Sequence, residues 1–168
     1  MAQTVYVNVG LPGSGKSTWA RETAKDTDII IICKDNIRNM LKGEYIFDPI
    51  YEPLVAEITS TAFNDALMAG FSIILDETHI TRQHRINCIE RIRNHTMPVQ
   101  PEIICVWFTE DENNLEYRMR EARGYSDIKW AEVLDKMVAN FQKPTKKEGF
   151  DEIIKIPFGS IMPSPCET

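Results

Sequence analysis

The sequence has no hydrophobic run long enough to span a bilayer, and its first residues lack the basic and apolar segments of a signal peptide. The four cysteines never stand in the C-x-x-C spacing that is typical of zinc and redox sites. Basic residues are in the minority, because 19 Lys and Arg stand against 25 Asp and Glu and leave a formal net charge of −6. These absences predict a cytoplasmic protein in a reducing environment, without membrane contact. The excess of acidic residues argues against tight, nonspecific binding to duplex nucleic acid.

The rest of the composition is that of an ordinary globular domain, with 43% hydrophobic and 26% charged residues among 168. Apolar runs and helical patterns alternate along the chain, which predicts an α/β fold with a mostly parallel sheet of about five strands and helices on both faces. We expect a single domain at 1–157 and a loose, proline-containing tail at 158–168. The predicted strands are 5–9, 29–33, 72–76, 102–108 and 152–156, and the predicted helices are 17–25, 36–42, 51–69, 82–95, 112–123 and 129–142.

Residues 10–17 read Gly-Leu-Pro-Gly-Ser-Gly-Lys-Ser and match the phosphate-binding P-loop motif G-x-x-x-x-G-K-[ST]. A predicted strand precedes the motif and a predicted helix follows it, which disfavours an ordinary glycine-rich turn. The glycines let backbone N–H groups approach phosphates, Lys16 can reach the terminal phosphates, and Ser17 can bind Mg²⁺. The sequence therefore predicts a site for a nucleoside triphosphate with Mg²⁺, formed by Gly10, Pro12, Gly13, Ser14, Gly15, Lys16, Ser17 and Thr18.

Asp35 and Arg38 follow the second predicted strand, and ligands in open α/β sheets bind beyond the carboxyl ends of the strands. Their spacing places both side chains on one face of the predicted helix. Asp35 could accept the proton of an attacking hydroxyl while Arg38 holds a phosphate of the acceptor. The alternative is that Asp35 caps the helix and Arg38 is a surface charge.

The third predicted strand ends in Asp76-Glu77-Thr78-His79. An acid at this place is typical of the second P-loop acid, which holds Mg²⁺ and its waters. Asp76 and Glu77 are both candidate metal ligands, and the position at the strand end favours Asp76. The pair is also compatible with a motor ATPase in which Glu77 polarises water, although such proteins usually have larger nucleotide domains. We expect His79 to make a polar contact rather than to act as a catalyst.

The predicted helix 112–123 carries arginines that a lid could bring to the transferred phosphate. Arg123 has no acid three or four residues before it and precedes Gly124, which permits a hinge, so it is the preferred lid arginine. Arg120 is a candidate nucleotide contact, although Glu116 four residues earlier offers it an ion pair.

Two further features could bind nucleic acid, and each has a structural alternative. Arginines cluster in two helical stretches and could form a basic groove, or they could belong to solvated helix faces. Trp130 could stack on a base, but it belongs to an apolar stripe along 129–142 for which core packing is favoured. The arginines are Arg82, Arg85, Arg91 and Arg93 in one stretch and Arg118, Arg120 and Arg123 in the other.

Taken together, these motifs resemble the phage-type polynucleotide 5′-hydroxyl kinases, a family within the P-loop kinases, over residues 5–141. The likeness rests on Gly-Leu-Pro-Gly-Ser-Gly-Lys-Ser-Thr-Trp-Ala-Arg at 10–21, Asp35-x-x-Arg38, Thr78 with Arg85, and Arg123-Gly124. It implies a P-loop kinase fold with a helical lid, ATP as donor with Mg²⁺, and the 5′-hydroxyl end of DNA or RNA as acceptor.

Residue roles are implied by the same resemblance. Asp35 corresponds to the general base, Arg38 to the residue that binds the neighbouring phosphate of the acceptor, and Arg123 to the lid arginine on the donor phosphates. Lys16 joins Asp35 and Arg123 as a catalytic residue, and Thr78 and Arg85 are expected on the acceptor side. The family's acid immediately precedes Thr, which selects Glu77 and not Asp76. The chain has no Asp-x-Asp phosphatase motif, so 3′-end processing is not expected.

Two other classes of function compete with this reading. A P-loop kinase for a small acceptor (a nucleoside, sugar acid, antibiotic or nucleotide sugar) would use similar residues, and the acidic pI suits a small substrate. A nucleotide-dependent switch is disfavoured, because the chain has no Asn-Lys-x-Asp element and no Asp-x-x-Gly after the third predicted strand. A regulatory ATP-binding protein without chemistry would not need Asp35.

Overall fold

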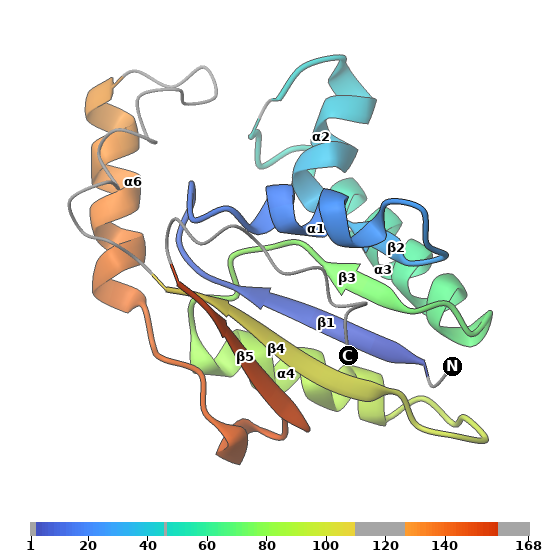
Figure 1. Cartoon of the computed structure of the whole chain (residues 1–168). Helices are drawn as coiled ribbons and strands as arrows, with labels where there is room; N and C mark the ends of the chain where they lie inside the picture. Colours follow the sequence, from blue (N-terminus) through green and yellow to red (C-terminus); the bar gives the residue numbers. More distant parts are fainter. Residues whose placement is uncertain (1–2, 46, 110–126, 158–168) are drawn as a thin grey trace.

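The computed structural model describes residues 3–45, 47–109 and 127–157, and within them five parallel strands form one sheet. The strand order is β2-β3-β1-β4-β5, so the chain starts in the middle of the sheet (Figure 1). β1 pairs on one side with β3, Val5 opposite Ile73, and on the other with β4, Thr4 opposite Glu102. The strands are β1 (Thr4–Val9), β2 (Ile30–Ile32), β3 (Ile73–Leu75), β4 (Glu102–Phe108) and β5 (Glu152–Ile156).

Helices cover both faces of this sheet, as the alternating sequence pattern predicts (Figure 1). Trp19 and Ala20 of α1 pack with Ile74 and Val106 on one face. α3 and α4 pack on the opposite face. The helices are α1 (Lys16–Ala24), α2 (Lys34–Lys42), α3 (Glu52–Met68), α4 (Arg82–Arg93) and α6 (Asp127–Asn140), with a short 3₁₀ helix η1 (Lys146–Glu148) before β5.

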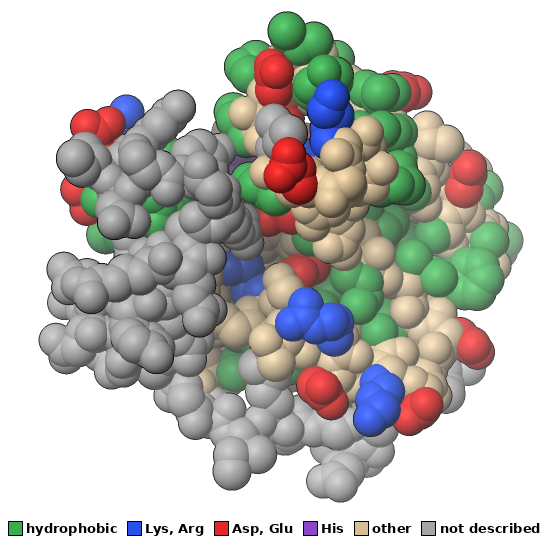
Figure 2. Space-filling view, turned by 90° about the horizontal axis from the view of Figure 1, so that it is seen from above, with side chains coloured by type: hydrophobic (Ala, Val, Ile, Leu, Met, Phe, Trp, Pro, Cys, Tyr) green, Lys and Arg blue, Asp and Glu red, His purple; other side chains and the backbone are tan. Residues whose placement is uncertain are grey.

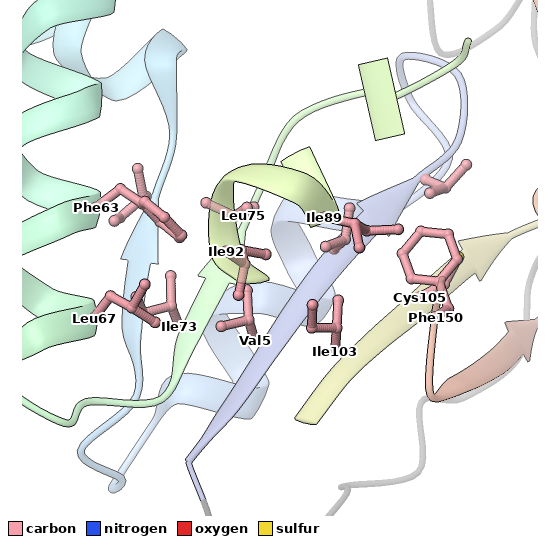
Figure 3. Close-up of a cluster of buried hydrophobic side chains, with 13 residues drawn as sticks. Val5, Phe63, Leu67, Ile73, Leu75, Ile89, Ile92, Ile103, Cys105 and Phe150 are labelled. Carbon is pink, nitrogen blue, oxygen red and sulfur yellow. The ribbon is translucent and has the colours of Figure 1, made fainter. Parts of the chain in front are cut away.

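The larger core lies between the sheet and the helices α3 and α4 (Figure 3). Val5 and Val7 of the central strand are fully buried, as is Ile73 of β3. Full burial of such a side chain contributes about 1.5–3 kcal/mol. β2 lies at the edge of the sheet, where Ile30 remains 37% exposed. The residues of this core include Phe63, Leu67, Leu75, Ile89, Ile92, Ile103, Cys105 and Phe150.

Every predicted strand and helix within the described residues is confirmed, and no boundary differs by more than two residues. The predicted helix 112–123 and the predicted tail 158–168 lie outside the described residues. Among the described residues, no helix is both long and apolar enough to cross a membrane. The described cysteines, Cys33, Cys88 and Cys105, are free thiols.

Core packing of the apolar stripe of α6 is confirmed for Trp130 and Leu134 but does not extend along the whole stripe. Trp130 and Leu134 are buried, but Val138 is 47% exposed. Val133 and Met137 line the cleft described below, as does Trp130. The reason is that α6 stands beside the sheet (Figure 1) and turns part of its stripe toward a ligand cleft.

Candidate functional site

A cleft of about 1470 Å³ opens at the carboxyl ends of β1, β2 and β3. Three consecutive crossovers supply its lining: the P-loop after β1, the first turns of α2 after β2, and the residues after β3. Residues of α3, α4 and α6 and of the segment between α2 and α3 complete it. The molecule is visibly hollowed there, with acidic and basic side chains at the rim (Figure 2). Parallel strands bring these segments to one edge of the sheet, which is why residues distant in sequence meet there.

The P-loop backbone has the conformation that phosphate binding requires. Gly15 is the N-cap of α1 with φ 99°, a left-handed conformation that favours glycine. A Cβ on Gly10 would lie 2.8 Å from the Ser14 Oγ and 3.1 Å from the Phe108 backbone, so a larger residue does not fit there. No side chain caps α1. Gly15, Lys16, Ser17 and Thr18 line the cleft, so the N-terminal turn of α1 lies at it and its N–H groups can bind an anion there.

Lys16 is held within the same loop. Its Nζ donates to the Leu11 carbonyl at 2.6 Å and to Ser14 Oγ at 3.3 Å, and the side chain is almost fully buried. Ser17 and Thr18 follow it into the first turn of α1 and line the cleft. Of the P-loop residues predicted to bind nucleotide, all line the cleft except Gly10 and Ser14, whereas Arg120 lies outside the described residues.

Asp35 and Arg38 both line the cleft, and Arg38 Nη1 donates to Asp35 Oδ1 at 2.6 Å. The helix α2 begins at Lys34 with Cys33 as its N-cap, so Asp35 lies in the first turn and is not the cap. Arg38 is 11% exposed, so it is not a surface charge either. The structure therefore contradicts both of the structural alternatives for this pair.

Glu52, the first residue of α3, fixes Arg38 from the other side. The Nε and Nη2 atoms of Arg38 donate to Glu52 Oε1 and Oε2 at 2.8 and 2.7 Å, a bidentate charge-assisted pair. This contact raises the pKa of Arg38 and lowers the pKa of Glu52. Arg38 thereby links α2 to α3 and holds the Asp35 carboxylate at the cleft. A phosphate would have to use the remaining N–H groups of the guanidinium.

The two acids after β3 lie in different environments. Asp76 is 7% exposed, and its Oδ1 accepts from Asn8 Nδ2 at 3.3 Å. Glu77 is paired with Lys34 Nζ at 3.2 Å and its side chain is 26% exposed. Both line the cleft, but Asp76 directly follows β3 and contacts Asn8 of the P-loop strand β1, whereas Glu77 is paired with Lys34. This placement favours Asp76 over Glu77 as a metal ligand.

The chemistry of these donors fits Mg²⁺. The hydroxyl of Ser17 and the carboxylate of Asp76 are hard oxygen ligands, and Mg²⁺ in such sites takes its remaining ligands from phosphates and waters. Asn8 Oδ1 is buried beside Asp76 without a partner in the described residues, so it can accept a hydrogen bond from a metal-bound water. Those residues contain no group of three or more His, Cys, Asp or Glu side chains that could hold a metal ion by themselves.

The segment after Glu77 is tied to the P-loop through its backbone. The Gly10 N–H donates to the Thr78 carbonyl at 3.0 Å. His79 adopts φ 40°, and its Nδ1 lies 2.9 Å from the Asn8 carbonyl. Burial lowers the pKa of His79, so the ring is neutral and Nδ1 donates to that carbonyl. His79 therefore makes a polar contact as predicted, and Thr78 lines the cleft.

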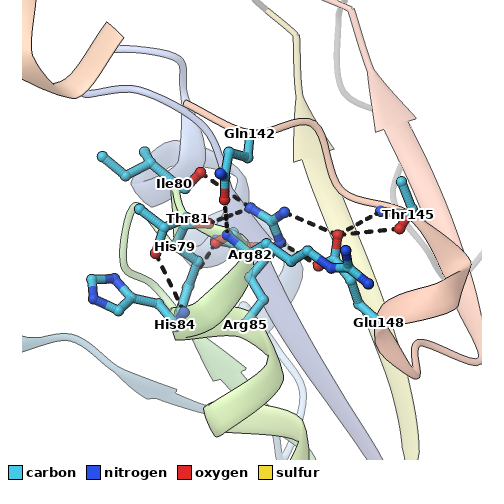
Figure 4. A network of polar contacts seen from close by, with 10 residues as sticks. His79, Ile80, Thr81, Arg82, His84, Arg85, Gln142, Thr145 and Glu148 are labelled. Atoms are coloured by element: carbon cyan, nitrogen blue, oxygen red, sulfur yellow. Dashed lines mark hydrogen bonds and ion pairs between the residues drawn. The ribbon is translucent and has the colours of Figure 1, made fainter. Parts of the chain in front are cut away.

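Arg85 is not where an acceptor could reach it, so the expectation that it binds substrate is not supported. Its side chain is fully buried and forms a bidentate ion pair with Glu148 of η1 at 2.6 and 3.0 Å. Nη1 donates to the His79 and Ile80 carbonyls (Figure 4). Arg85 does not line the cleft, and its contacts instead hold the segment after β3 in place.

The other arginines of α4 do not form a basic groove. Arg93 pairs with Asp151 at 2.6 Å, near the opposite end of the helix from the cleft. Arg91 bonds Ser60 and Asn64 and is the member of this cluster that lines the cleft. Arg91 and Arg93 therefore contact different parts of the molecule and do not line one common groove. Arg118, Arg120 and Arg123 lie outside the described residues, so the predicted lid arginines stay a prediction.

No cysteine in the cleft is suited to nucleophilic chemistry. Cys33 and Cys88 line it, but burial raises the pKa of Cys33 and raises the pKa of Cys88 to about 12. Both are therefore protonated thiols near neutral pH, whereas the nucleophilic form is the thiolate.

Sequence reasoning missed several residues of this site, among them Glu52, Lys34 and Phe47. Lys34 and Phe47 line the cleft, and Glu52 holds Arg38. Glu52-Pro53 has the signal of a helix start, with an acid and a proline in the first turn. That signal locates the helix but does not show that the Glu52 side chain turns back to Arg38.

Residues 5–144 match the AAA domain family AAA_33. The chain belongs to this family. Solved structures with a similar fold include a chain of the Pnkp1/Rnl/Hen1 RNA repair complex, with 19% identity and a TM-score of 0.66 over 89% of this chain. A fungal RNA kinase is 15% identical, with a TM-score of 0.67 over 98% of this chain and 80% of its own. A gluconokinase from Sinorhizobium meliloti 1021 is 18% identical, with a TM-score of 0.53 over 95% of this chain and 84% of its own.

These similarities establish the P-loop kinase fold. Their identities are too low to carry an activity across. The chain spans about half of the RNA repair protein, 47% of its length.

Proposed function

We propose that the chain is a polynucleotide 5′-hydroxyl kinase, which transfers the γ-phosphoryl group of ATP to the 5′-hydroxyl end of DNA or RNA. The observation that carries this proposal is the position of Asp35. Its carboxylate lines the same cleft as Lys16 and Ser17 and is held there by Arg38 at 2.6 Å. A base opposite a triphosphate site is what phosphoryl transfer to an alcohol needs.

In this scheme the acceptor oxygen attacks the γ-phosphorus as the bond from that phosphorus to the leaving ADP oxygen breaks. Asp35 accepts the proton of the hydroxyl, and Lys16 stabilises negative charge on the phosphates. Ser17 and Asp76 would hold Mg²⁺, which neutralises charge on the donor phosphates. On the family resemblance, Arg123 contacts the donor from the lid, and Arg120 is a further candidate contact for the nucleotide. Arg38 contacts a phosphate of the acceptor through its remaining N–H groups, and Thr78 lies on the acceptor side.

The fungal RNA kinase and the RNA repair complex support a nucleic-acid acceptor for this fold. The gluconokinase supports the alternative, a kinase for a small acceptor such as a sugar acid.

The experiment is an acceptor panel with ATP labelled at the γ-phosphate and supplied with Mg²⁺. It contains DNA and RNA oligomers with 5′-hydroxyl ends, nucleoside 3′-monophosphates, free nucleosides and gluconate. We expect label on the oligomers and on the nucleoside 3′-monophosphates. Label on gluconate or on free nucleosides alone would support the small-acceptor kinase, and no label on any 5′-hydroxyl would refute the proposal.

A further inference from the structure

The cleft has an aromatic wall beside Asp35 that the phosphoryl-transfer scheme does not use. Tyr45, Phe47 and Pro49 come from the segment between α2 and α3 and line the cleft with Asp35 and Arg38. Triphosphate binding does not require such rings, because phosphates are held by backbone N–H groups and cations. The wall therefore belongs to the part of the cleft that would receive the acceptor.

Phe47 is held from one side by a cation. The Cζ of Arg38 lies 5.4 Å from the centre of the Phe47 ring, within the range of a cation–π contact. Arg38 is itself fixed by two carboxylates, Glu52 and Asp35, so the ring is fixed in turn. Phe47 is nevertheless 51% exposed, which leaves ring surface open to a ligand.

The same guanidinium contacts both Asp35 and the Phe47 ring. The carboxylate of Asp35, which is the proposed general base, and the ring of Phe47 therefore both contact one side chain, that of Arg38. This arrangement suits a terminal nucleoside, whose 5′-hydroxyl and base are joined through one sugar. An aromatic ring attracts any planar nucleobase.

We propose that the base of the acceptor's 5′-terminal nucleotide stacks on Phe47. This inference rests on the function proposed above and adds how the acceptor is recognised. Stacking on an aromatic side chain tolerates every base, because each presents a π-face. Binding of the acceptor would therefore require a nucleobase at its 5′ end but would not depend on which nucleobase that is.

Other exposed apolar residues nearby do not share this environment. Ile50 is 79% exposed and Met40 is 66% exposed, but neither lines the cleft. Ile50 lies three positions from Phe47 in the same segment, so it provides a matched control for the loss of an exposed apolar side chain.

The experiment compares two oligonucleotides that differ only in the 5′-terminal residue, which is either a normal nucleotide or an abasic sugar with its 5′-hydroxyl. Wild-type protein should show a KM for the normal acceptor that is roughly tenfold to a hundredfold lower than for the abasic one. Phe47→Leu should raise the KM of the normal acceptor by a similar factor and discriminate little between the two. Phe47→Tyr, which keeps the ring, and Ile50→Ala should behave as wild type, and the KM for ATP should not change in any variant.

Two results would overturn the inference while leaving the proposed function intact. One is equal KM values of the wild-type protein for the two oligonucleotides, which needs no variant and no assumption about folding. The other is a Phe47→Leu protein that still discriminates as wild type does. Absence of transfer to either oligonucleotide would instead overturn the proposed function, and the stacking with it.

Discussion

Asp35 is the residue whose chemistry can be tested most directly. Asp35→Asn keeps an oxygen that can accept from Arg38 but removes the basic carboxylate. We expect kcat to fall about a hundredfold or more, because a general base contributes that much to proton transfer. ATP affinity should stay near that of wild type, since the P-loop is untouched. Steady-state kinetics and nucleotide titration measure the two quantities.

The matched control for this substitution is Asp28→Asn, because Asp28 is exposed and does not line the cleft. It should transfer phosphate at the wild-type rate. An Asp35→Asn protein that kept more than a tenth of wild-type kcat would remove Asp35 from the mechanism.

His79 should make the stability of the protein depend on pH. Burial lowers the pKa of the folded-state ring below its ordinary value, so the unfolded chain binds a proton first as the pH falls. The contribution of His79 to the unfolding free energy is complete above pH about 6.5 and is lost as pH falls through the lower, folded-state pKa. Urea unfolding between pH 7.5 and 5 should show this decline in the wild-type protein.

The decline assigned to His79 is measured against two variants. His79→Gln should lose less unfolding free energy than wild type over the same pH range. His84→Gln replaces an exposed ring and should follow the wild-type curve. Parallel curves for wild type and His79→Gln would count against this assignment.

At the scale of elements, the Arg85–Glu148 pair joins α4 to η1 beneath the segment that carries Asp76 and Glu77. Breaking a buried pair by removing one charge costs about 3–5 kcal/mol, because the other charge stays buried without compensation. We therefore expect Glu148→Gln to lower the unfolding free energy by roughly 3 kcal/mol, measured by urea unfolding.

The double variant Arg85→Met with Glu148→Leu should recover much of that loss, because hydrophobic residues can replace a buried pair. Gln83→Ala, at an exposed position of the same helix, should cost well under 1 kcal/mol. If Glu148→Gln unfolded at the wild-type urea concentration, the pair would not be what holds η1 to α4.

For the whole molecule, nucleotide binding should stabilise the fold, because the cleft collects segments from several crossovers of the sheet. Saturation with ATP and Mg²⁺ to a hundred times Kd should raise the unfolding free energy by about 2.7 kcal/mol. Removal of Mg²⁺ with a chelator should reduce this gain and stop phosphate transfer. Thermal unfolding with and without chelator measures the change.

Ser17→Ala tests whether the gain depends on the proposed metal ligand. It should lower the Mg²⁺-dependent part of the stabilisation, whereas Thr61→Ala, which removes an exposed hydroxyl of α3, should not. Full Mg²⁺-dependent stabilisation of Ser17→Ala would exclude Ser17 as the ligand.

The fold could be predicted from the sequence because its signals are local. The strand run before the P-loop, the glycines at 10, 13 and 15 and the helix after Lys16 lie within about two dozen residues. The alternation of strands and helices then places the carboxyl ends of the strands at one edge. That rule was enough to bring Lys16, Asp35 and Asp76 into one cleft, which the structure confirms.

What the sequence by itself determined is thus the P-loop, the order of strands and helices, and which crossovers meet at the cleft, because each follows from the spacing of neighbouring residues. Only the tertiary structure decided where the charged side chains point. Arg85 pairs with Glu148, which lies 63 positions later in the sequence, and Arg38 pairs with Glu52, which lies 14 positions later. Such pairs depend on how helices pack, since a side chain's partner is set by the surface its helix meets and not by the residues next to it in the chain.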